Sequence, residues 1–347
     1  MALRRRQAQV PLLRLFQTMA EVRAFEEALG DLYRRGLISG ELHLGIGEEG
    51  AIVGVVDHLR DGDSIAIDHR STPPLVARGT DLQALALEML GHPEGLCHGQ
   101  GGHMHLFDPD RLAASSGIVG AAACTACGFA LAHQQQRAGS VAVAFFGEGA
   151  ANQGMLLEAL NLASVWRLPV LFVCKDSRWA ITTRSARMTG GSLTRRARAF
   201  GLPAAEVDGH RPWAVWKAAA RAIDRARQGR GASFLVVRVK RPRGHFEDDE
   251  LVRVARHPRE ALRESRRLLA GTLGCRGSEA GERALGLMEV TRTITTAMGE
   301  QLTPSHDPLV VTARRLAPQD VAAIRSEATR KVDEAISAAL AIAGAPS

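Results

Sequence analysis

A single carboxylate between two glycines is the first group in this sequence that could do chemistry. Glu148 stands in the segment AFFGEGAANQG (144–154). The residues before it, VAVAFF (141–146), are uncharged and rich in β-branched and aromatic types, as in a central strand of a parallel sheet. The residues after it, MLLEALNLASVW (155–166), carry apolar side chains at helical spacing. Glu148 is therefore predicted to lie in a strand-to-helix turn, and ligands of open α/β sheets bind where such turns gather.

A second polar turn, DSRWAITT (176–183), follows the next predicted strand, LPVLFVCKD (168–176). Carboxylates from two adjacent strand ends, or one carboxylate and a neutral oxygen, can hold Mg²⁺. This ion prefers near-octahedral oxygen ligands and commonly bridges to the phosphates of a cofactor. The start of the helix after Glu148 adds backbone N–H groups and the positive end of a helix dipole. The two turns together indicate a site for a metal ion and a phosphorylated ligand.

Alternating β and α segments must position these turns. Strands are predicted at SIAID (64–68), 140–146, 168–176, 204–209 and 232–241. Helices are predicted at 11–36, 81–91, 155–167, 212–229 and 316–344, with a Gly-rich turn and a long helix over 117–136 and a further helix at 256–271. Between the first strand and the second helix, HRSTPPLVARG (69–79) is predicted to be a Pro-containing loop. This alternation predicts an α/β fold with a doubly wound parallel sheet and helices on both faces.

The charge pattern bears on the class of ligand. The net charge is +7, but the basic clusters lie on different segments, and aromatic residues make up only 4% of the chain. A nucleic-acid-binding protein more often shows one basic stripe with interleaved aromatics, so we expect anionic small molecules and no nucleic acid. No stretch approaches the roughly 18 apolar residues of a membrane helix, and the N-terminus lacks the apolar core of a signal peptide. We therefore expect a cytoplasmic protein without a membrane partner.

The segment GEGAANQGMLLEALNLASVWRLPVLFVCKDSRWAITT (147–183) resembles the thiamine-diphosphate motif of the alpha subunit of 2-oxo acid dehydrogenases. That family is the decarboxylating first component of the pyruvate, branched-chain and acetoin dehydrogenase complexes. The resemblance continues, in the family's order, in LHLGIGEEG (42–50), DHRSTPPLVARGTDL (68–82), GQGGHMH (99–105), GIVGAA (117–122), VDG (207–209) and RPRGHFEDD (241–249). It implies a thiamine-diphosphate-binding domain over 1–265. The remainder, 266–347, would be a helical C-terminal extension with a divergent segment, 271–312.

The resemblance implies a metal site. Glu148 would be the acidic Mg²⁺ ligand, and Trp179 stands at a Tyr position whose backbone carbonyl is a ligand. Ser177 stands where the family usually has an Asn ligand; a hydroxyl coordinates Mg²⁺ less well than an amide carbonyl, so neighbouring Asp176 is an alternative. The same motif would bind the cofactor through Gly147, Glu148, Gly149 and Ala150.

The resemblance also implies how thiamine diphosphate is held. Gly117 and Val119 match backbone groups that meet the aminopyrimidine ring. Arg70 and Arg241 match arginines that grip the diphosphate, with His69 beside them in place of the common Tyr.

Two further residues would act on the substrate. His245 matches an active-site histidine in a loop that orders when the cofactor binds, and it is the candidate for proton transfer. Thr72 replaces a histidine that in many members handles substrate, which implies an altered substrate. The prolines that follow it would stiffen the loop.

The family's glutamate that activates the pyrimidine lies on a separate beta subunit. The resemblance thus implies an α₂β₂ heterotetramer with the cofactor at the interface. The expected activity is decarboxylation of a 2-oxo acid with transfer of the acyl or aldehyde unit to a lipoyl-bearing acyltransferase or another acceptor. An acyloin-forming or acyloin-cleaving enzyme stays open as an alternative, and so does a degenerate, non-catalytic subunit. Ser177 is the residue that separates a competent site from a degenerate one.

Other histidines admit more than one interpretation. His98, His103 and His105 could bind zinc, but the resemblance favours a structural loop beside the cofactor. His210 in VDGHRP is predicted to be a surface turn residue.

Overall fold

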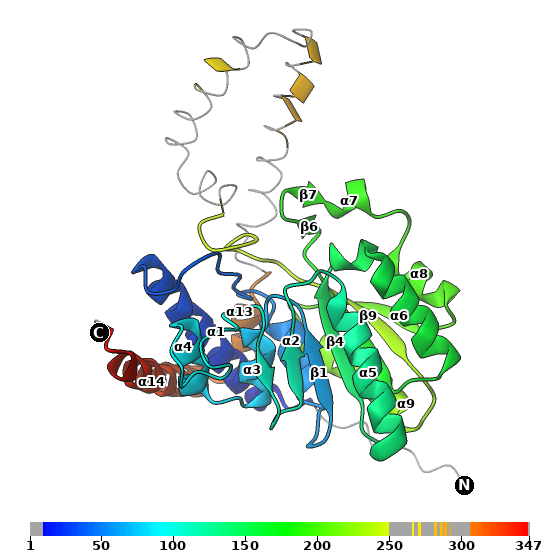
Figure 1. The fold of residues 1–347 in the computed structure, drawn as a ribbon, viewed down its shortest axis with the longest axis horizontal. Helices are drawn as coiled ribbons and strands as arrows, with labels where there is room; N and C mark the ends of the chain where they lie inside the picture. The colour runs from blue at the N-terminus through cyan, green and yellow to red at the C-terminus, as the bar shows by residue number, and fades with distance from the viewer. Residues whose placement is uncertain are drawn as a thin grey trace.

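The structure is a computed structural model that describes residues 10–249 and 306–345, together with isolated residues between 266 and 292 (Figure 1). Most of the helix predicted at 256–271 and most of the divergent segment 271–312 lie outside the described residues.

A seven-stranded sheet forms the centre of the molecule, in the order β2-β3-β1-β4-β5-β9-β8. All neighbouring strands are parallel except β2 and β3, which are antiparallel. The strands are β1 (Ser64–Ile67), β2 (Phe107–Asp108), β3 (Ala113–Ser115), β4 (Ala142–Gly147), β5 (Val170–Asp176), β8 (Ala204–Asp208) and β9 (Ser233–Arg238). The predicted α/β fold with a mostly parallel sheet is confirmed.

The apolar sequence of the central strands follows from burial on both faces of the sheet. In β4, Val143 and Phe145 face one hydrophobic cluster, whereas Ala144 and Phe146 face the other. Because successive side chains of a strand point to opposite faces, a strand covered on both sides must be apolar at every position. This explains why these strands read as uninterrupted apolar runs.

Helices cover both faces (Figure 1). One cluster joins the sheet to α1 (Leu12–Arg34), α2 (Glu49–Val56), α3 (Thr72–Arg78), α4 (Leu82–Met89), α9 (Pro212–Arg227), α13 (Pro308–Ala313) and α14 (Pro318–Ala343). The other joins it to α5 (Ala121–Gln136), α6 (Gly154–Val165) and α8 (Leu193–Ala199). Short elements connect them: a 3₁₀ turn (Ala150–Asn152), the hairpin β6 (Trp179–Ala180) and β7 (Thr183–Arg184), and α7 (Ser185–Met188). None of the described helices is both long and apolar enough to span a membrane.

The predicted Pro-containing loop over 69–79 is wrong, because most of it forms helix α3. Pro73 and Pro74 occupy its first turn. At that position the missing N–H costs no hydrogen bond, and the fixed φ of proline suits a helix start. The two prolines therefore begin a helix.

The helix predicted at 316–344 is confirmed as α14, which lies against α1 and α4 (Figure 1). Its buried residues Val332, Ile336 and Leu340 belong to the same hydrophobic cluster as α1. The described part of the C-terminal segment thus shares a core with the N-terminal helix, and the proposed division at residue 265 stays a prediction.

The strand order reverses between β1 and β4, and the space at the carboxyl ends of these two strands is called the crevice below. After β1 the chain passes to β2 and β3 on one side, and it then returns to form β4 on the other side of β1. In open α/β sheets, the carboxyl ends of two such strands are the place where ligands bind. The segments that follow β1 and β4 contain Arg70 and Glu148.

Candidate active site

The predicted metal ligands come together at the carboxyl ends of β4 and β5. Glu148 directly follows β4 and is 1% exposed. Its Oε1 accepts hydrogen bonds from the Ser177 hydroxyl at 2.5 Å and from the Trp179 backbone N–H at 2.7 Å. The Ser177 Oγ also lies 3.2 Å from the Trp179 carbonyl oxygen. The Glu148 carboxylate, the Ser177 hydroxyl and the Trp179 carbonyl are three potential metal ligands. They come from two strand ends and form one cluster, called the oxygen cluster below.

The chemistry of this oxygen cluster fits Mg²⁺. Glu148 Oε2 is buried and has no hydrogen-bond partner among the described residues. Burial raises the pKa of Glu148, against the opposing influence of Arg241 and Ser177. With Mg–O distances of 2.0–2.1 Å, neighbouring oxygens of an octahedron lie about 2.9 Å apart, which is close to the spacings in the cluster. A divalent cation would satisfy the unpartnered oxygen and offset the cost of burying the carboxylate.

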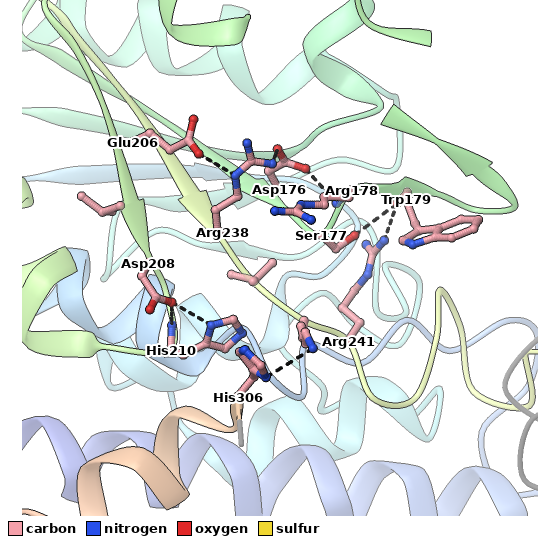
Figure 2. Close-up of a pocket in the computed structure, with 13 residues that line it drawn as sticks. Asp176, Ser177, Arg178, Trp179, Glu206, Asp208, His210, Arg238, Arg241 and His306 are labelled. Atoms are coloured by element: carbon pink, nitrogen blue, oxygen red, sulfur yellow. Dashed lines mark hydrogen bonds and ion pairs between the residues drawn. The ribbon is translucent and has the colours of Figure 1, made fainter. Parts of the chain in front are cut away.

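Arg241 places a positive charge beside the same oxygens. It lies in the segment after β9 and donates from Nη2 to the Trp179 carbonyl at 2.6 Å. The same nitrogen is 3.6 Å from Glu148 Oε1. Figure 2 shows the guanidinium pointing toward Ser177 and Trp179. Arg241, within the basic run KRPR (240–243), is thus a buried member of the site.

Asp176, the alternative metal ligand, is occupied by other partners. Its Oδ2 accepts from Arg238 Nη1 at 2.6 Å, and its Oδ1 accepts from the Arg178 backbone N–H at 2.8 Å (Figure 2). Both oxygens are thus used, whereas Glu148 keeps one oxygen without a partner. This favours Ser177 over Asp176 as the additional ligand.

Arg70 is the centre of a buried charge network at the end of β1. It is 1% exposed and donates from Nη1 to the Leu44 carbonyl at 2.6 Å and from Nη2 to the His245 carbonyl. Its Nε lies 3.8 Å from Glu48 Oε1, and burial lowers its pKa to about 10. Lys175 Nζ joins the network 2.9 Å from Glu48 and 3.1 Å from Asp68.

Sequence reasoning missed Glu48, Asp68 and Lys175 as members of this network. A signal was present, because Lys175 interrupts the apolar run VLFVC and Asp68 ends the run SIAI. Charged residues are rarely buried unless they are paired, so two of them at the ends of buried strands indicate mutual contact.

Imidazole rings gather beside Arg70. The ring centroid of His43 lies 4.6 Å from that of His69 and 5.0 Å from that of His245. His103 Nε2 is 2.9 Å from His43 Nδ1. Burial, reinforced by Arg70, lowers the pKa of all four; the values are about 3 for His43, about 4 for His103 and about 2 for His245. These rings are therefore neutral at pH 7, and His43 is a site residue that sequence reasoning missed.

The glycine-rich segments bring backbone close to side chains. A Cβ on Gly117 would lie 3.1 Å from His105 Nε2, and one on Gly149 would lie 3.1 Å from the Cβ of Ala180. Beside Gly117, Ile118 is 64% exposed and Val119 is 51% exposed. The turn before α5 thus presents apolar side chains outward.

Two more predicted cofactor-binding residues flank Glu148 in the chain. Gly147 ends β4, and Ala150 is buried in the 3₁₀ turn that leads toward α6. Together they place the backbone at the carboxyl end of β4 next to the oxygen cluster.

Thr72 does not present a free hydroxyl. It is buried in the first turn of α3, where its Oγ1 donates to Glu26 Oε1 at 2.5 Å. Glu26 Oε2 accepts from the Gly45 backbone N–H at 2.5 Å. Sequence reasoning missed Glu26, which lies within the amphipathic helix α1 with no local sign of its role.

A cavity of about 540 Å³ adjoins the oxygen cluster, within the size range of ligand pockets (Figure 2). Ser177, Trp179 and Arg241 line one side, and Asp208, His210 and His306 line another. The prediction that His210 lies at the surface is wrong: the residue is 7% exposed, and its Nδ1 contacts Asp208 Oδ1 at 2.7 Å. The His210 ring also packs against that of His306, with ring centroids 4.9 Å apart.

Comparison with known proteins finds related sequences over most of the chain. Residues 17–270 match the family model described as dehydrogenase E1 component. The alpha subunit of the acetoin:2,6-dichlorophenolindophenol oxidoreductase of Bacillus subtilis is 42% identical over 237 residues, 68% of this chain and 71% of that protein. The subunit of the same name from Cupriavidus necator is 44% identical over 240 residues, 69% of this chain and 72% of that protein.

The alpha subunit of the pyruvate dehydrogenase E1 component of Zymomonas mobilis is 38% identical over 241 residues. That match covers 69% of this chain and 68% of the relative. The resemblance inferred from the motifs is confirmed, and with a family match over most of its length the chain belongs to the dehydrogenase E1 component family.

Proposed function

We propose that this chain is the alpha subunit of a thiamine-diphosphate-dependent oxidoreductase that decarboxylates a 2-oxo acid, with Mg²⁺ between Glu148, Ser177 and the Trp179 carbonyl. The observation that carries the proposal is the buried carboxylate of Glu148. Its Oε1 accepts from Ser177, whose hydroxyl also lies 3.2 Å from the Trp179 carbonyl, and its Oε2 has no hydrogen-bond partner among the described residues. Such an arrangement is costly unless a cation completes it.

The cofactor's diphosphate would lie between Arg70 and Arg241, with His69 beside them. Arg241 reaches the ends of β4 and β5, and Arg70 lies at the end of β1, so the two guanidinium groups flank the crevice from opposite sides. One arginine guanidinium can donate two parallel hydrogen bonds to two oxygens of a phosphate group, so arginine is well suited to binding a diphosphate. The backbones of Gly147, Gly149 and Ala150 would contact the diphosphate, and those of Gly117 and Val119 the aminopyrimidine ring.

When bound, thiamine diphosphate supplies a carbanion nucleophile and an electron sink for the carbon that loses CO₂. The chain's own contribution is to anchor, to orient and to handle protons. His245 is held by two backbone contacts, because its carbonyl accepts from Arg70 and its N–H donates to Asp249 at 2.7 Å. Its imidazole is neutral at pH 7, because burial and then Arg70 lower its pKa to about 2. At that pKa the ring is a weak base, and it would take up a proton only when the negative charge of a bound ligand raises the pKa. Thr72 is hydrogen-bonded to Glu26, so it would hold the part of the chain that borders the substrate in place. It would not exchange protons with the substrate itself.

A separate beta subunit would complete the site. Ile118 and Val119 expose apolar side chains directly beside Gly117, and exposed apolar surface next to a ligand crevice is typical of an interface. We infer an α₂β₂ heterotetramer with the cofactor between subunits. A lipoyl-bearing acyltransferase would accept the acyl unit together with two electrons. With a small-molecule oxidant, the oxidant would accept the two electrons and water would accept the acyl unit.

A second candidate substrate is an acyloin. The relatives at 42% and 44% identity are alpha subunits of acetoin oxidoreductases, whereas the pyruvate dehydrogenase subunit is 38% identical. Cleavage of acetoin would use the same cofactor, with an aldehyde leaving in place of CO₂, and it would need one further proton transfer, from the acetoin hydroxyl to a base, as the C–C bond breaks.

The test is titration of thiamine diphosphate, by calorimetry, into the full chain co-expressed with its beta subunit, with and without Mg²⁺. Binding should require Mg²⁺ and should be lost in Glu148→Gln, which keeps the shape but removes the charge. Glu158→Gln, at an exposed position of α6, is the matched control and should bind as the wild type does. Binding that is independent of Mg²⁺, or its absence in an intact heterotetramer, would overturn the proposal and leave a non-catalytic subunit.

Substrate choice is then read from turnover. Reduction of 2,6-dichlorophenolindophenol by the heterotetramer should be measured with a series of 2-oxo acids and with acetoin. Turnover with a 2-oxo acid supports the first candidate. Turnover with acetoin alone supports the second.

A further inference from the structure

The structure assigns a second metal site, for a borderline transition metal ion such as Zn²⁺ or Co²⁺, to the imidazoles of His43, His69 and His245. It is distinct from the oxygen cluster around Glu148. Metal binding at this site does not rest on the proposed function, whereas its competition with the cofactor does. The three histidines come from three separate segments: the loop before α2, the end of β1 and the segment after β9. Only the folded sheet brings them together.

The geometry is close to that of a three-histidine site. One potential ligand atom from each ring lies within 4.8 Å of the other two. With Zn–N distances of 2.0–2.1 Å, nitrogens of a tetrahedral site lie about 3.4 Å apart, so rotations that move the nitrogens by about 1 Å close the site. His69 Nε2 is already buried and has no hydrogen-bond partner among the described residues. A metal ion would satisfy it.

The protonation of the rings also suits a metal. Burial and the neighbouring Arg70 lower the pKa of His43 to about 3 and that of His245 to about 2, and they lower the pKa of His69 as well. Neutral imidazoles keep a lone pair for coordination at pH 7, so no proton has to be displaced first. His103, 2.9 Å from His43 Nδ1, can hold that ring in the tautomer that leaves Nε2 for the metal.

The cationic side chains nearest the three rings oppose a metal ion, and buried carboxylates that pair with Arg70 and Lys175 offset this charge in part. Three buried cationic side chains surround the crevice, and three buried carboxylates face them; they are Arg70, Arg241 and Lys175, and Glu48, Asp68 and Glu148. One contact opposes the metal most directly, because Arg70 Nη2 lies 3.3 Å from His245 Nδ1. This contact must break if His245 Nδ1 coordinates the metal.

Ligand type separates the two sites. Imidazole nitrogens suit zinc, copper, nickel and cobalt, whereas carboxylate and carbonyl oxygens suit Mg²⁺. His69 and His245 also border the space proposed for the cofactor's diphosphate. A transition metal bound there should therefore compete with the cofactor, which makes the cluster an inhibitory site for such ions.

The experiment is a titration of the full chain, free of thiamine diphosphate, with Co²⁺, followed by the visible d–d absorption of tetrahedral cobalt. We expect one equivalent to bind, and the affinity to fall about tenfold or more in His69→Gln and in His43→Gln. His98→Gln is the matched control, because His98 lies outside the cluster and contacts the Pro93 carbonyl, and it should bind as the wild type does. Thermal unfolding of each variant checks that it has folded.

Three results would overturn the assignment. The wild type could show no spectrum of tetrahedral cobalt, or the spectrum could be the same in His69→Gln and in His43→Gln as in the wild type. The spectrum could also disappear in Glu148→Gln and persist in the two histidine variants. The last would place the ion in the oxygen cluster. Competition gives a second readout. A fixed Co²⁺ concentration should weaken the binding of thiamine diphosphate to the wild type. It should leave unchanged whatever affinity for thiamine diphosphate the His69→Gln variant keeps. If the chain binds cobalt in this way but never binds thiamine diphosphate, the metal site stands and only the proposed function fails.

Discussion

The hydroxyl of Thr72 donates a 2.5 Å hydrogen bond to Oε1 of Glu26, and both side chains are buried between α1 and α3. Thr72→Val keeps the shape and removes the donor, which leaves a buried carboxylate oxygen unpartnered. We expect the free energy of unfolding to fall by about 1–3 kcal/mol, measured by urea titration. Thr72→Ser retains the hydroxyl and should lose less than about 1 kcal/mol. Equal losses in the two variants would show that the hydrogen bond contributes nothing.

The protonation of Glu26 should make stability depend on pH. Burial raises its pKa from 4.5 to about 7 in the folded chain, so the folded state holds its proton more tightly than the unfolded state. The stabilisation is fully present below pH 4.5 and is lost as the pH rises through about 7, by about 3 kcal/mol. Unfolding free energies at pH 4.5 and pH 7.5 should show this decrease in the wild type relative to Glu26→Gln, which cannot titrate. If the unfolding free energy changes with pH by the same amount in the wild type and in Glu26→Gln, the titration of Glu26 does not affect stability.

Ser177 should set the strength of the Mg²⁺ site. Ser177→Ala removes one of the three oxygens of the cluster, and we expect Mg²⁺ to support thiamine-diphosphate binding about tenfold less well. Ser177→Asn supplies an amide carbonyl, a better ligand, and should match or exceed the wild type. The measurement is the Mg²⁺ concentration that gives half-maximal cofactor binding in calorimetry. An alanine variant indistinguishable from the wild type would remove Ser177 from the metal site.

Asp176 should affect stability and leave metal binding unchanged. Asp176→Asn breaks the ion pair with Arg238, which is 34% exposed at its side chain, and should cost about 1–2 kcal/mol of unfolding free energy. The Mg²⁺ requirement for cofactor binding should stay as in the wild type. Glu206→Gln, which removes the other carboxylate on Arg238, is more exposed and should cost less than about 1 kcal/mol. A shifted Mg²⁺ requirement in Asp176→Asn would make this residue a ligand after all.

The exposed turn before α5 should be needed for the beta subunit. Ile118→Asp puts a charge on a side chain that is 64% exposed, so the isolated chain should keep its stability within about 0.5 kcal/mol. Co-purification with the beta subunit should be lost, as measured by size-exclusion chromatography of the co-expressed pair. Leu13→Asp, an exposed apolar position on α1, is the control and should still form the complex. Intact heterotetramer in Ile118→Asp would place the interface elsewhere.

Local patterns in the sequence were sufficient to predict most of the helices and strands. They also predicted the part of the site whose residues lie close together in the chain. Apolar runs predicted the central strands, because those strands are buried on both faces, and helical spacing predicted α6 and α14. Glu148 and the polar turn 176–183 could be placed in advance because they follow two strands that are adjacent in the chain and in the sheet, whereas the roles of Ser177 and Trp179 came from the family resemblance. Local pattern misjudged Pro73 and Pro74, because proline favours both turns and the first turn of a helix.

Only the tertiary structure decided which distant residues meet. The pairing of β9 between β5 and β8 sends the following segment back across the strand ends, so that Arg241 reaches Trp179 and His245 reaches Arg70 (Figure 1). The same packing buries His210 and joins Thr72 to Glu26, which are 46 residues apart in the chain. Sequence fixes local conformation through backbone preference and side-chain periodicity. The burial of a charge, and with it the pKa and the partner of that charge, depends on contacts between segments that no local pattern records.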